Sequence, residues 1–438
     1  MCLQKEFAGK TREYETKPNT YHIVTYGCQM NEHDSEKLAA MLEEMGLTAI
    51  QEREEADFVL FNTCCIRENA QRKALGNITW LKHLKKKKPA LLVGVCGCMV
   101  QQKGMREMIL KQYPFVDMAF GTHNLYQFPE LFYQMLVEKK RVVEIIENEY
   151  LIAEGIPVLR EKPYKGFITI MYGCNNYCSY CIVPYVRGKE RSRNPQEIVK
   201  EAKNLYNQGV KEIMLLGQNV NSYQGGAQGE VTFPKLLEAL DEIGIPRIRF
   251  MTSHPKDLSS DLIQVMKNSK HICNHFHLPI QSGSNTILKA MNRGYTVEEY
   301  LTKINALREA IPGIGITTDL IVAFPGETEE DFENTLSLVK QVGFDAAFTF
   351  VFSPRNGTKA ATMENQLDKK TGKERIGRLI KLQDEITKKI HDSLLGQIEE
   401  VLVEGFSKKD PSRVSGKGTR SITITFDGSH EDIGEIIP

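Results

Sequence analysis

Three cysteines in one short stretch are the residues whose spacing most clearly indicates chemistry. Cys174, Cys178 and Cys181 form a C-x3-C-x2-C run directly after an apolar segment. Three thiolates on one loop can bind three irons of a 4Fe–4S cube and leave the fourth iron open to an exchangeable ligand. A zinc knuckle is the alternative, but zinc takes four ligands, and no fourth Cys or His follows at the spacing of a zinc finger. The run therefore predicts a 4Fe–4S cluster.

A second group of cysteines occurs in a pattern that repeats three times from Tyr21 onward. Each repeat has an apolar stretch, a loop with Cys and a helical stretch, and the repeats begin YHIVTYGCQMN, DFVLFNTCCIR and ALLVGVCGCM. Alternating strands and helices predict a doubly wound parallel sheet, in which the loops after the strands open on one edge. The cysteines would stand at helix starts, where the helix dipole favours thiolate. We therefore expect one site built from Cys28, Cys64 or Cys65, and Cys96 or Cys98.

A longer series of strands and helices follows from about residue 166. Its six apolar segments are GFITIMYG, EIMLLGQN, RIRFMTSH, HFHLPIQ, GITTDLIVAF and AAFTFVFSP. Helical segments separate them, and in one of these Thr328 is the predicted N-cap, with Asp331 three residues later. Six strands on this plan predict an open, partial (βα)6 TIM-like barrel, whose active residues would lie in the loops after the strands.

The fold class predicted for the whole chain is α/β, with a doubly wound sheet, a partial barrel and a small all-β unit in that order. A length of 438 residues exceeds one ordinary core and favours about three domains. Composition and charge change along the chain at the expected boundaries. We predict a flexible tail over 1–18, the doubly wound domain over 19–137, a linker over 138–165, the barrel core over 166–392 and the all-β unit over 393–438.

The overall charge excludes a global field that would attract a polyanion. Lys plus Arg number 56 and Asp plus Glu also number 56, so any nucleic-acid binding must come from local patches. The start is polar, unlike a signal peptide, and no apolar run is long enough to span a bilayer. These features predict a cytoplasmic protein without membrane association, in which reduced cysteines serve as metal ligands or catalytic groups.

The cysteine motifs resemble those of known enzymes. C-x3-C-x2-C at the start of a (βα)6 barrel resembles the signature of radical S-adenosylmethionine enzymes, whose open iron chelates S-adenosylmethionine and whose cluster cleaves it to a 5′-deoxyadenosyl radical. YGCQMN, NTCCIR and GCM are similar to the three amino-terminal motifs of the methylthiotransferase family. This resemblance implies a second 4Fe–4S cluster held by Cys28, Cys64 and Cys98. Cys65 and Cys96 then fall outside the ligand positions and are expected to be small buried residues.

Further stretches are most similar to the tRNA-modifying MiaB type within this family. They are IVPYVRGKERSR, LGQNVNSY, RFMTSHPKDL, HLPIQSGSNTILKAMNRGYTVEEY, TTDLIVAFPGETEEDF and FSPRNGTKAA. The resemblance implies replacement of the C2 hydrogen of N6-isopentenyladenosine at position 37, beside the tRNA anticodon, by a methylthio group. One S-adenosylmethionine would supply the methyl group and another the radical, while the second cluster hosts the sulfur. The implied partners are the anticodon stem-loop of tRNA and an electron donor such as flavodoxin or ferredoxin, with the enzyme a monomer.

Two other functions remain open. A methylthiotransferase could instead act on threonylcarbamoyladenosine in tRNA or on an aspartate of a ribosomal protein, and local chemistry does not separate these substrates. From a different class, a non-catalytic iron–sulfur or zinc protein could bind RNA or carry electrons. A carrier, however, needs neither an open iron nor polar loops at six strand ends.

Polar residues at the predicted strand ends suit the ribose, amino and carboxylate groups of S-adenosylmethionine. The predicted contacts are Gln218, Asn219, Ser253, Gln281 and Asp319. Radical abstraction needs no acid–base histidine, so structural roles are favoured for His254, His275 and His277.

Basic stretches are the candidates for RNA contact. One stretch follows the C-x3-C-x2-C loop, where phosphate contacts would position an RNA. Another lies in the all-β unit. This unit resembles the RNA-binding TRAM domain but is about two strands shorter than the family usually shows. A third run, 85–88, reads as a solvated helix end. The predicted RNA contacts are Arg187, Lys189, Arg191, Arg193, Lys408 and Lys409.

Overall fold

A computed structural model of the chain describes residues 2–66, 68–146 and 151–438. Its contacts divide the chain into two compact units. The first unit comprises Met1–Glu161, Tyr172–Asn175 and Cys181–Arg191. The second comprises Lys162–Met171, Asn176–Tyr180 and Ser192–Pro438. The chain thus returns twice to the first unit after entering the second, which a division into consecutive domains did not anticipate.

The first unit is built on a six-stranded sheet in the order β2-β1-β3-β4-β5-β6, with every neighbouring pair parallel. All six residues of β3 are buried, as expected for a parallel sheet covered on both faces. This confirms the predicted doubly wound sheet. The strands are β1 (Thr20–Thr25), β2 (Thr48–Ala49), β3 (Phe58–Thr63), β4 (Leu92–Gly97), β5 (Met118–Phe120) and β6 (Val142–Glu144).

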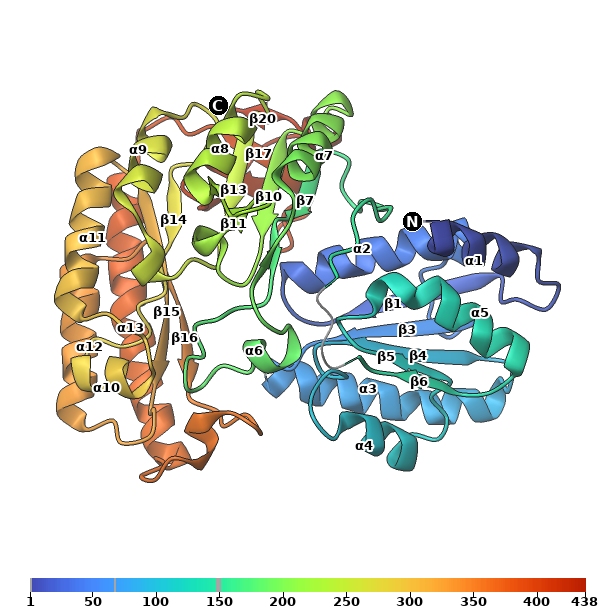
Figure 1. Cartoon of the computed structure of the whole chain (residues 1–438). Helices are drawn as coiled ribbons and strands as arrows, with labels where there is room; N and C mark the ends of the chain where they lie inside the picture. Colours follow the sequence, from blue (N-terminus) through green and yellow to red (C-terminus); the bar gives the residue numbers. More distant parts are fainter. Residues whose placement is uncertain (1, 67, 147–150) are drawn as a thin grey trace. The chain divides into compact units, whose positions relative to one another are not determined.

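Helices cover both faces of this sheet (Figure 1). Apolar residues of α1, α2 and α5 form one core against the sheet, and those of α3 and α4 form another on the opposite face. Successive residues of a strand point to opposite faces of the sheet. Because each face has its own apolar core, the residues that point to either face of the central strands are apolar. The helices are α1 (Cys2–Glu13), α2 (Gln29–Glu44), α3 (Glu68–Lys87), α4 (Met105–Gln112) and α5 (Phe128–Glu138), with a short 3-10 turn η1 (Leu125–Gln127).

The structure differs from two of the predicted boundaries. The expected flexible tail contains α1, which packs on α5: the Phe7 and Tyr133 rings are 5.9 Å apart, and the Tyr14 hydroxyl donates to the Leu136 carbonyl. A polar helix of this length is marginal alone and depends on such packing. The expected linker 138–165 likewise contains β6, an edge strand of the sheet. Part of that linker, 147–150, lies outside the described residues.

The second unit contains the six predicted barrel strands as two parallel three-stranded sheets, β13-β10-β7 and β14-β15-β16. A parallel bridge between Ile248 and Ile272 links the two sheets, so the strands follow one open barrel. This confirms the partial (βα)6 plan. The strands are β7 (Lys165–Thr169), β10 (Glu212–Leu216), β13 (Arg247–Phe250), β14 (His275–His277), β15 (Gly315–Val322) and β16 (Ala346–Val351).

Helices alternate with these strands and bury one face against them. The predicted N-cap is confirmed: Thr328 and Asp331 form a capping box that begins α12. The helices are α7 (Pro195–Asn207), α8 (Phe233–Asp241), α9 (Ser260–Asn268), α10 (Asn285–Ala290), α11 (Val297–Ala310), α12 (Glu329–Val342) and α13 (Lys369–Ser393). Shorter elements are α6 (Val183–Val186), β8 (Met171–Tyr172), β9 (Arg191–Ser192), β11 (Gln224–Gly225), β12 (Val231–Thr232), η2 (Val220–Ser222), η3 (Pro255–Asp257), η4 (Lys359–Thr362) and η5 (His430–Asp432).

The carboxyl-terminal residues form the predicted all-β unit, an antiparallel sheet in the order β19-β18-β17-β20. Arg247, at the start of β13, donates to the carbonyls of Lys417 and Glu400, and Arg420 pairs with Asp345 just before β16. The sheet therefore docks on the amino ends of the barrel strands. Its strands are β17 (Val401–Phe406), β18 (Val414–Lys417), β19 (Thr423–Phe426) and β20 (Ile436–Ile437). Its likeness to TRAM stays a prediction.

Candidate metal centres

The cysteines of the first unit lie at the carboxyl ends of three adjacent strands. Cys28 is the N-cap of α2 after β1, Cys64 follows β3 and Cys98 follows β4. Burial raises the pKa of the Cys98 thiol to about 12; the Arg187 charge opposes this, and the nearby Cys64 and Cys28 thiols add to it. The structure thus brings the three predicted ligands into one neighbourhood, while their role as iron ligands stays a prediction.

Two glycines allow the cysteine loops to approach one another. Gly97 has a φ of 94°, and a Cβ added there would lie 2.4 Å from the Thr63 carbonyl oxygen. Gly27 has a φ of 131°, and a Cβ there would lie 2.8 Å from Cys64 Cβ. Only glycine combines this left-handed backbone with so little space. Gly27 directly precedes Cys28, and Gly97 directly precedes Cys98. The glycines therefore allow the tight backbone turns that place these two predicted ligands.

The two cysteines assigned to the core are indeed buried. Cys65 packs with one apolar core of the sheet, and Cys96, inside β4, packs with the other. The expectation that all the thiols stand at helix starts holds only for Cys28, because α3 begins at Glu68 and α4 at Met105. The helix dipole therefore assists one thiolate of the set.

A buried arginine contacts this cysteine set. Arg187 is 5% exposed; its Nε donates to Cys98 Sγ at 3.1 Å, and an Nη donates to Asn31 Oδ1 at 3.0 Å and to Asp34 Oδ2 at 2.8 Å. The predicted contact between Arg187 and RNA phosphate is therefore wrong, because the guanidinium is enclosed and its donors are used inside the protein. An arginine in a basic stretch reads as a surface residue, and only the fold reveals the sulfur partner.

Thiolates, which both predicted cysteine sets would supply, are the usual ligands of iron–sulfur clusters. Within the described ranges, no three Cys, His, Asp or Glu side chains converge as the ligands of one metal ion do. A 4Fe–4S cube instead takes one thiolate per iron and spaces its ligands over three corners. Soft thiolates on three neighbouring loops, with a cationic group beside one sulfur, suit such a cluster.

The predicted set of Cys174, Cys178 and Cys181 lies on the loop after β8. Cys174 and Cys178 are buried, and Cys181 is half-buried. Residues 176–180 are held by the turn after α10: Asn292 Nδ2 donates to the carbonyls of Asn176 and Tyr177, and the Ser179 amide donates to the Met291 carbonyl. These hydrogen bonds support the backbone of this part of the cysteine loop.

A second buried arginine reaches a sulfur of this loop. Arg293 is 5% exposed, and its Nη donates to Cys178 Sγ at 3.3 Å, while other donors reach the Tyr295 hydroxyl and the Pro279 carbonyl. Sequence reasoning missed Arg293. The surrounding Met-Asn-Arg-Gly stretch carries a turn signal, but nothing in it indicates a sulfur partner 115 residues away.

The five predicted S-adenosylmethionine contacts lie on barrel strands or directly after them. Asn219 and Ser253 are buried after the neighbouring strands β10 and β13, and Asn219 Oδ1 and Ser253 Oγ have no hydrogen-bond partner among the described residues. An unpaired buried polar atom costs about 1–3 kcal/mol, which a polar ligand would recover. Gln218 is half-buried beside Asn219. Gln281 adopts a φ of 75° and donates its amide to the Asp319 carbonyl, and Asp319 lies within β15 rather than in a loop.

The three histidines are buried, with His254 just before η3 and the other two in β14. His275 Nε2 and His277 Nδ1 both hydrogen-bond the Thr317 hydroxyl, at 2.9 and 3.0 Å. Burial lowers the pKa of His275 to about 3 and that of His254 to about 2, so both imidazoles are neutral near pH 7. His254 Nδ1 accepts from the Lys256 amide. Each ring thus makes a hydrogen bond within the protein, while the buried Nε2 of His254 has no partner among the described residues.

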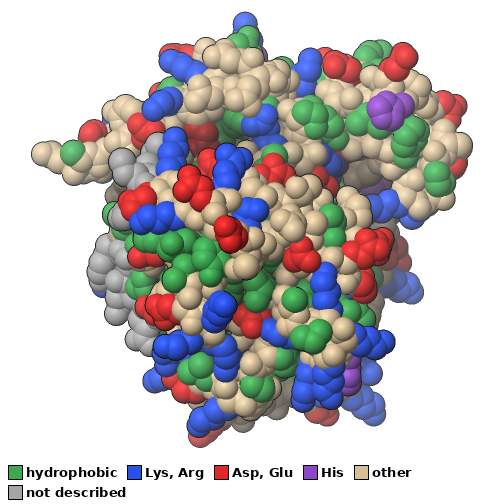
Figure 2. Space-filling model, turned by 90° about the vertical axis from the view of Figure 1, so that its right-hand side faces the viewer, with side chains coloured by type: hydrophobic (Ala, Val, Ile, Leu, Met, Phe, Trp, Pro, Cys, Tyr) green, Lys and Arg blue, Asp and Glu red, His purple; other side chains and the backbone are tan. Residues whose placement is uncertain are grey.

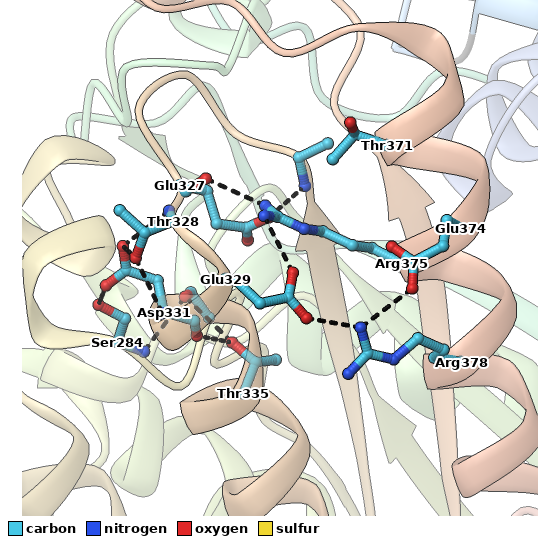
Figure 3. Close-up of polar contacts among 12 residues, drawn as sticks. Ser284, Glu327, Thr328, Glu329, Asp331, Thr335, Thr371, Glu374, Arg375 and Arg378 are labelled. Carbon is cyan, nitrogen blue, oxygen red and sulfur yellow. Dashed lines mark hydrogen bonds and ion pairs between the residues drawn. The ribbon is translucent and has the colours of Figure 1, made fainter.

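An ion-pair network holds the loop after β15 to α13 (Figure 3). The Glu327 carboxylate accepts from the Arg375 guanidinium at 2.6 Å and from the Ala323 amide, where the backbone φ is 56°. Arg375 also reaches Glu329, which in turn pairs with Arg378. The network fixes the left-handed turn that ends the strand carrying Asp319.

The other basic candidates divide into enclosed and exposed side chains. Arg193 is buried, donates to the Thr169 carbonyl and pairs with Glu201, so its predicted phosphate contact is also wrong. The Arg191 guanidinium lies over the Tyr172 ring at 5.8 Å. Positive and negative side chains are interspersed on the face drawn in Figure 2, as the balanced composition predicts. Exposed lysines remain as RNA candidates: Lys189, Lys408 and Lys409.

The run 85–88 lies at the end of α3, as predicted, but only Lys86 and Lys87 are exposed, while Lys85 and Lys88 are half-buried in ion pairs. Lys85 pairs with Asp117, and Lys88 pairs with Asp57 and donates to the carbonyls of Glu55 and Ala56. These lysines tie the end of α3 to neighbouring loops.

Comparison with known proteins agrees with this architecture. The radical SAM superfamily model matches residues 168–339, and the model called uncharacterized protein family UPF0004 matches residues 20–121. The methyltransferase TsrM from Kitasatospora setae has a similar fold, with a TM-score of 0.56 and 14% identity over 78% of this chain and 77% of that one. OxsB gives a TM-score of 0.53 at 12% identity, over 84% of this chain and 56% of that one. Fold and cysteine motif thus define a radical S-adenosylmethionine protein.

Sequence relatives narrow the class. Proteins called tRNA-2-methylthio-N(6)-dimethylallyladenosine synthase are 51% identical in Clostridium beijerinckii, over 95% of this chain and 92% of the relative, and 50% identical in Lachnoclostridium phytofermentans, over 100% and 96%. A third, in Alkaliphilus oremlandii, is 52% identical over 96% and 90%. The chain belongs to the tRNA-2-methylthio-N(6)-dimethylallyladenosine synthase family. No helix in the described part of the chain is long and apolar enough to cross a membrane.

Proposed function

We propose that this chain replaces the C2 hydrogen of N6-isopentenyladenosine at position 37 of tRNA with a methylthio group. The observation that carries the proposal is the gathering of Cys28, Cys64 and Cys98 at one sheet edge, in a chain that also has the C-x3-C-x2-C loop. A radical protein with one cysteine set has no second place to hold sulfur. Two sets support a division between radical formation and sulfur insertion.

We infer that each cysteine set holds one 4Fe–4S cluster, and that S-adenosylmethionine binds at the barrel. When bound, these groups supply the electron transfer, the radical, and the sulfur and methyl group that are inserted. The residues of the chain bind, orient and enclose them. Asn219 Oδ1 and Ser253 Oγ offer polar partners at neighbouring strand ends, and burial of Cys174 and Cys178 limits access of water.

The proposed macromolecular partner is the anticodon stem-loop of an isopentenylated tRNA. Exposed Lys189, Lys408 and Lys409 can contact phosphates, which position a nucleic acid without reading its sequence. A small redox protein such as flavodoxin or ferredoxin would supply electrons. We place the reaction in the cytoplasm, with the enzyme acting as a monomer.

The decisive experiment is mass analysis of nucleosides from tRNA incubated anaerobically with reconstituted protein, S-adenosylmethionine and a reductant. Isopentenylated tRNA should yield the 2-methylthio derivative, and tRNA lacking the isopentenyl group should yield none. Threonylcarbamoylated tRNA and a ribosomal-protein substrate serve as parallel reactions. Modification of either of these, with isopentenylated tRNA unchanged, would overturn the proposal.

A further inference from the structure

Arg187 stands where three separate loops of the first unit meet. Its Nη donates to Asn31 Oδ1, and the Asn31 amide nitrogen donates to the carbonyls of Tyr26 and Thr63. Tyr26 precedes the Cys28 loop, and Thr63 directly precedes Cys64. The Arg187 Nε donates to Cys98 Sγ, which lies on the third loop. One buried network therefore connects the backbone or sulfur of all three loops.

The charges around Arg187 are few and enclosed. Its guanidinium pairs with the Asp34 carboxylate at 2.8 Å, and both side chains are less than a tenth exposed. An arginine guanidinium keeps its proton in proteins, and the Asp34 carboxylate beside it favours the charged form. The cation thus remains charged at any working pH. A fixed positive charge that donates to a sulfur is a recognised means of tuning a cluster potential.

The geometry points to Arg187 as a positioning residue that holds Cys98 and raises the reduction potential of a cluster on Cys28, Cys64 and Cys98. This inference rests on the proposed second cluster. Reduction adds one negative charge to a cluster, and a cation touching one ligand sulfur stabilises the reduced form more than the oxidised form. Asp34 acts against this by partly neutralising the guanidinium. Opposite effects on the potential are therefore expected from removing the cation and from removing its carboxylate partner.

The test uses the full chain with Cys174→Ala, Cys178→Ala and Cys181→Ala, so that only the second set can hold iron. Iron and sulfide are counted first, and the midpoint potential is then measured by electron paramagnetic resonance during redox titration. Arg187→Gln should shift the midpoint to more negative values and speed release of iron to a chelator. Asp34→Asn should shift the midpoint to more positive values. Arg187→Lys, which keeps the charge, should stay closer to the parent than Arg187→Gln.

Arg293→Gln is the matched control, because this second buried arginine donates to Cys178 rather than Cys98. In the same background it should leave the midpoint of the second cluster unchanged. If Arg187→Gln fails to fold, Asp34→Asn still tests the sign of the effect. A cluster present with equal midpoints in all Arg187 and Asp34 variants would overturn this inference. A parent without iron and sulfide would instead overturn the proposed second cluster.

Discussion

The cysteines of the two sets are surrounded by residues that fix their positions. Gly97 and Gly27 adopt left-handed backbone directly before two predicted ligands, and a Cβ at either would collide with a neighbouring loop. Arg187 and Arg293 each donate to one cysteine sulfur from a buried position. Each predicted site thus consists of cysteine thiols and one buried arginine beside them, and in the Cys28, Cys64 and Cys98 set two glycines make room for the loops.

The two cysteine sets should be separable by single substitutions. Cys174→Ala should abolish cleavage of S-adenosylmethionine, because the open iron would lose its supporting ligand set. Cys98→Ala should spare reductive cleavage and remove sulfur insertion. Both effects can be followed by chromatography of 5′-deoxyadenosine and of tRNA nucleosides. Formation of the methylthio product by both variants would contradict the division of labour.

Gly97→Ala should disrupt the second set and leave the first intact. The left-handed φ alone costs roughly 1–3 kcal/mol for a residue with a side chain, and the clash with the Thr63 carbonyl adds to that. Iron content should fall by about half, since one of two four-iron clusters would be lost. Gly104→Ala is the control, because Gly104 also has a positive φ but no atom within 4 Å of the added Cβ. Equal iron loss in both variants would contradict the claim that a clash at residue 97 disrupts the set.

Elements position these residues through contacts that are distant in the sequence. The sheet order places β1, β3 and β4 side by side, so that three loops share one edge. In the second unit, the turn after α10 supports residues 176–180, and α13 holds the loop after β15 through Arg375 (Figure 3). The helices thus contribute to the sites by fixing loops rather than by supplying ligands.

The Glu327–Arg375 pair should be a major contribution to the stability of the second unit. Arg375→Ala leaves the buried Glu327 carboxylate without its cation, a loss of about 3–5 kcal/mol. Burial raises the pKa of Glu327 while Arg375 lowers it, so removing Arg375 should raise that pKa further. Arg378→Ala, at a more exposed site, should cost only about 0–1 kcal/mol. Urea unfolding followed by circular dichroism distinguishes them, and equal losses would contradict the buried role.

The strands and cysteine loops were predictable because they depend on local patterns. Apolar runs predicted all six barrel strands, and their order placed the cysteines at one sheet edge. The helix α1 was not predictable, since its polar sequence becomes helical by packing on α5. Arg187 was assigned to the surface because charge usually indicates exposure. Its true partners lie 89 and 153 residues away, at Cys98 and Asp34, and only the fold brings them together.

For the whole molecule, each of the two compact units carries residues of the predicted chemistry. The first carries Cys28, Cys64 and Cys98 and also Cys174 and Cys181, and the second carries Cys178 and the barrel. In the barrel, Asn219 Oδ1 and Ser253 Oγ have no hydrogen-bond partner among the described residues. The all-β sheet docks on the amino ends of the barrel strands, at the opposite end from the predicted S-adenosylmethionine contacts. Because positive and negative side chains are equal in number, any RNA contact must come from local groups of basic residues.

Stability should fall in mild acid because of buried histidines. Burial lowers the folded-state pKa of His275 to about 3, below its unfolded value of roughly 6.5, so the unfolded chain binds the extra proton. Its contribution is present above about pH 6.5 and is lost at about 1.4 kcal/mol per pH unit as the pH falls toward 3. His275→Asn should therefore flatten the dependence of unfolding free energy on pH between 7 and 5. Burial raises the pKa of Glu36 to about 7, which changes stability with pH in the opposite direction. This contribution is the same in the parent and the variant, so the difference between them reports His275. An unchanged slope would contradict the neutral buried imidazole.

Iron and acid-labile sulfide counting in three proteins tests the two-cluster claim most directly. The parent chain, reconstituted anaerobically, should hold about eight irons and as many sulfides. The triple alanine variant at Cys28, Cys64 and Cys98 should hold about four of each, and so should the triple variant at Cys174, Cys178 and Cys181. Zinc without sulfide, or a parent with about four irons that only one triple variant removes, would contradict the account.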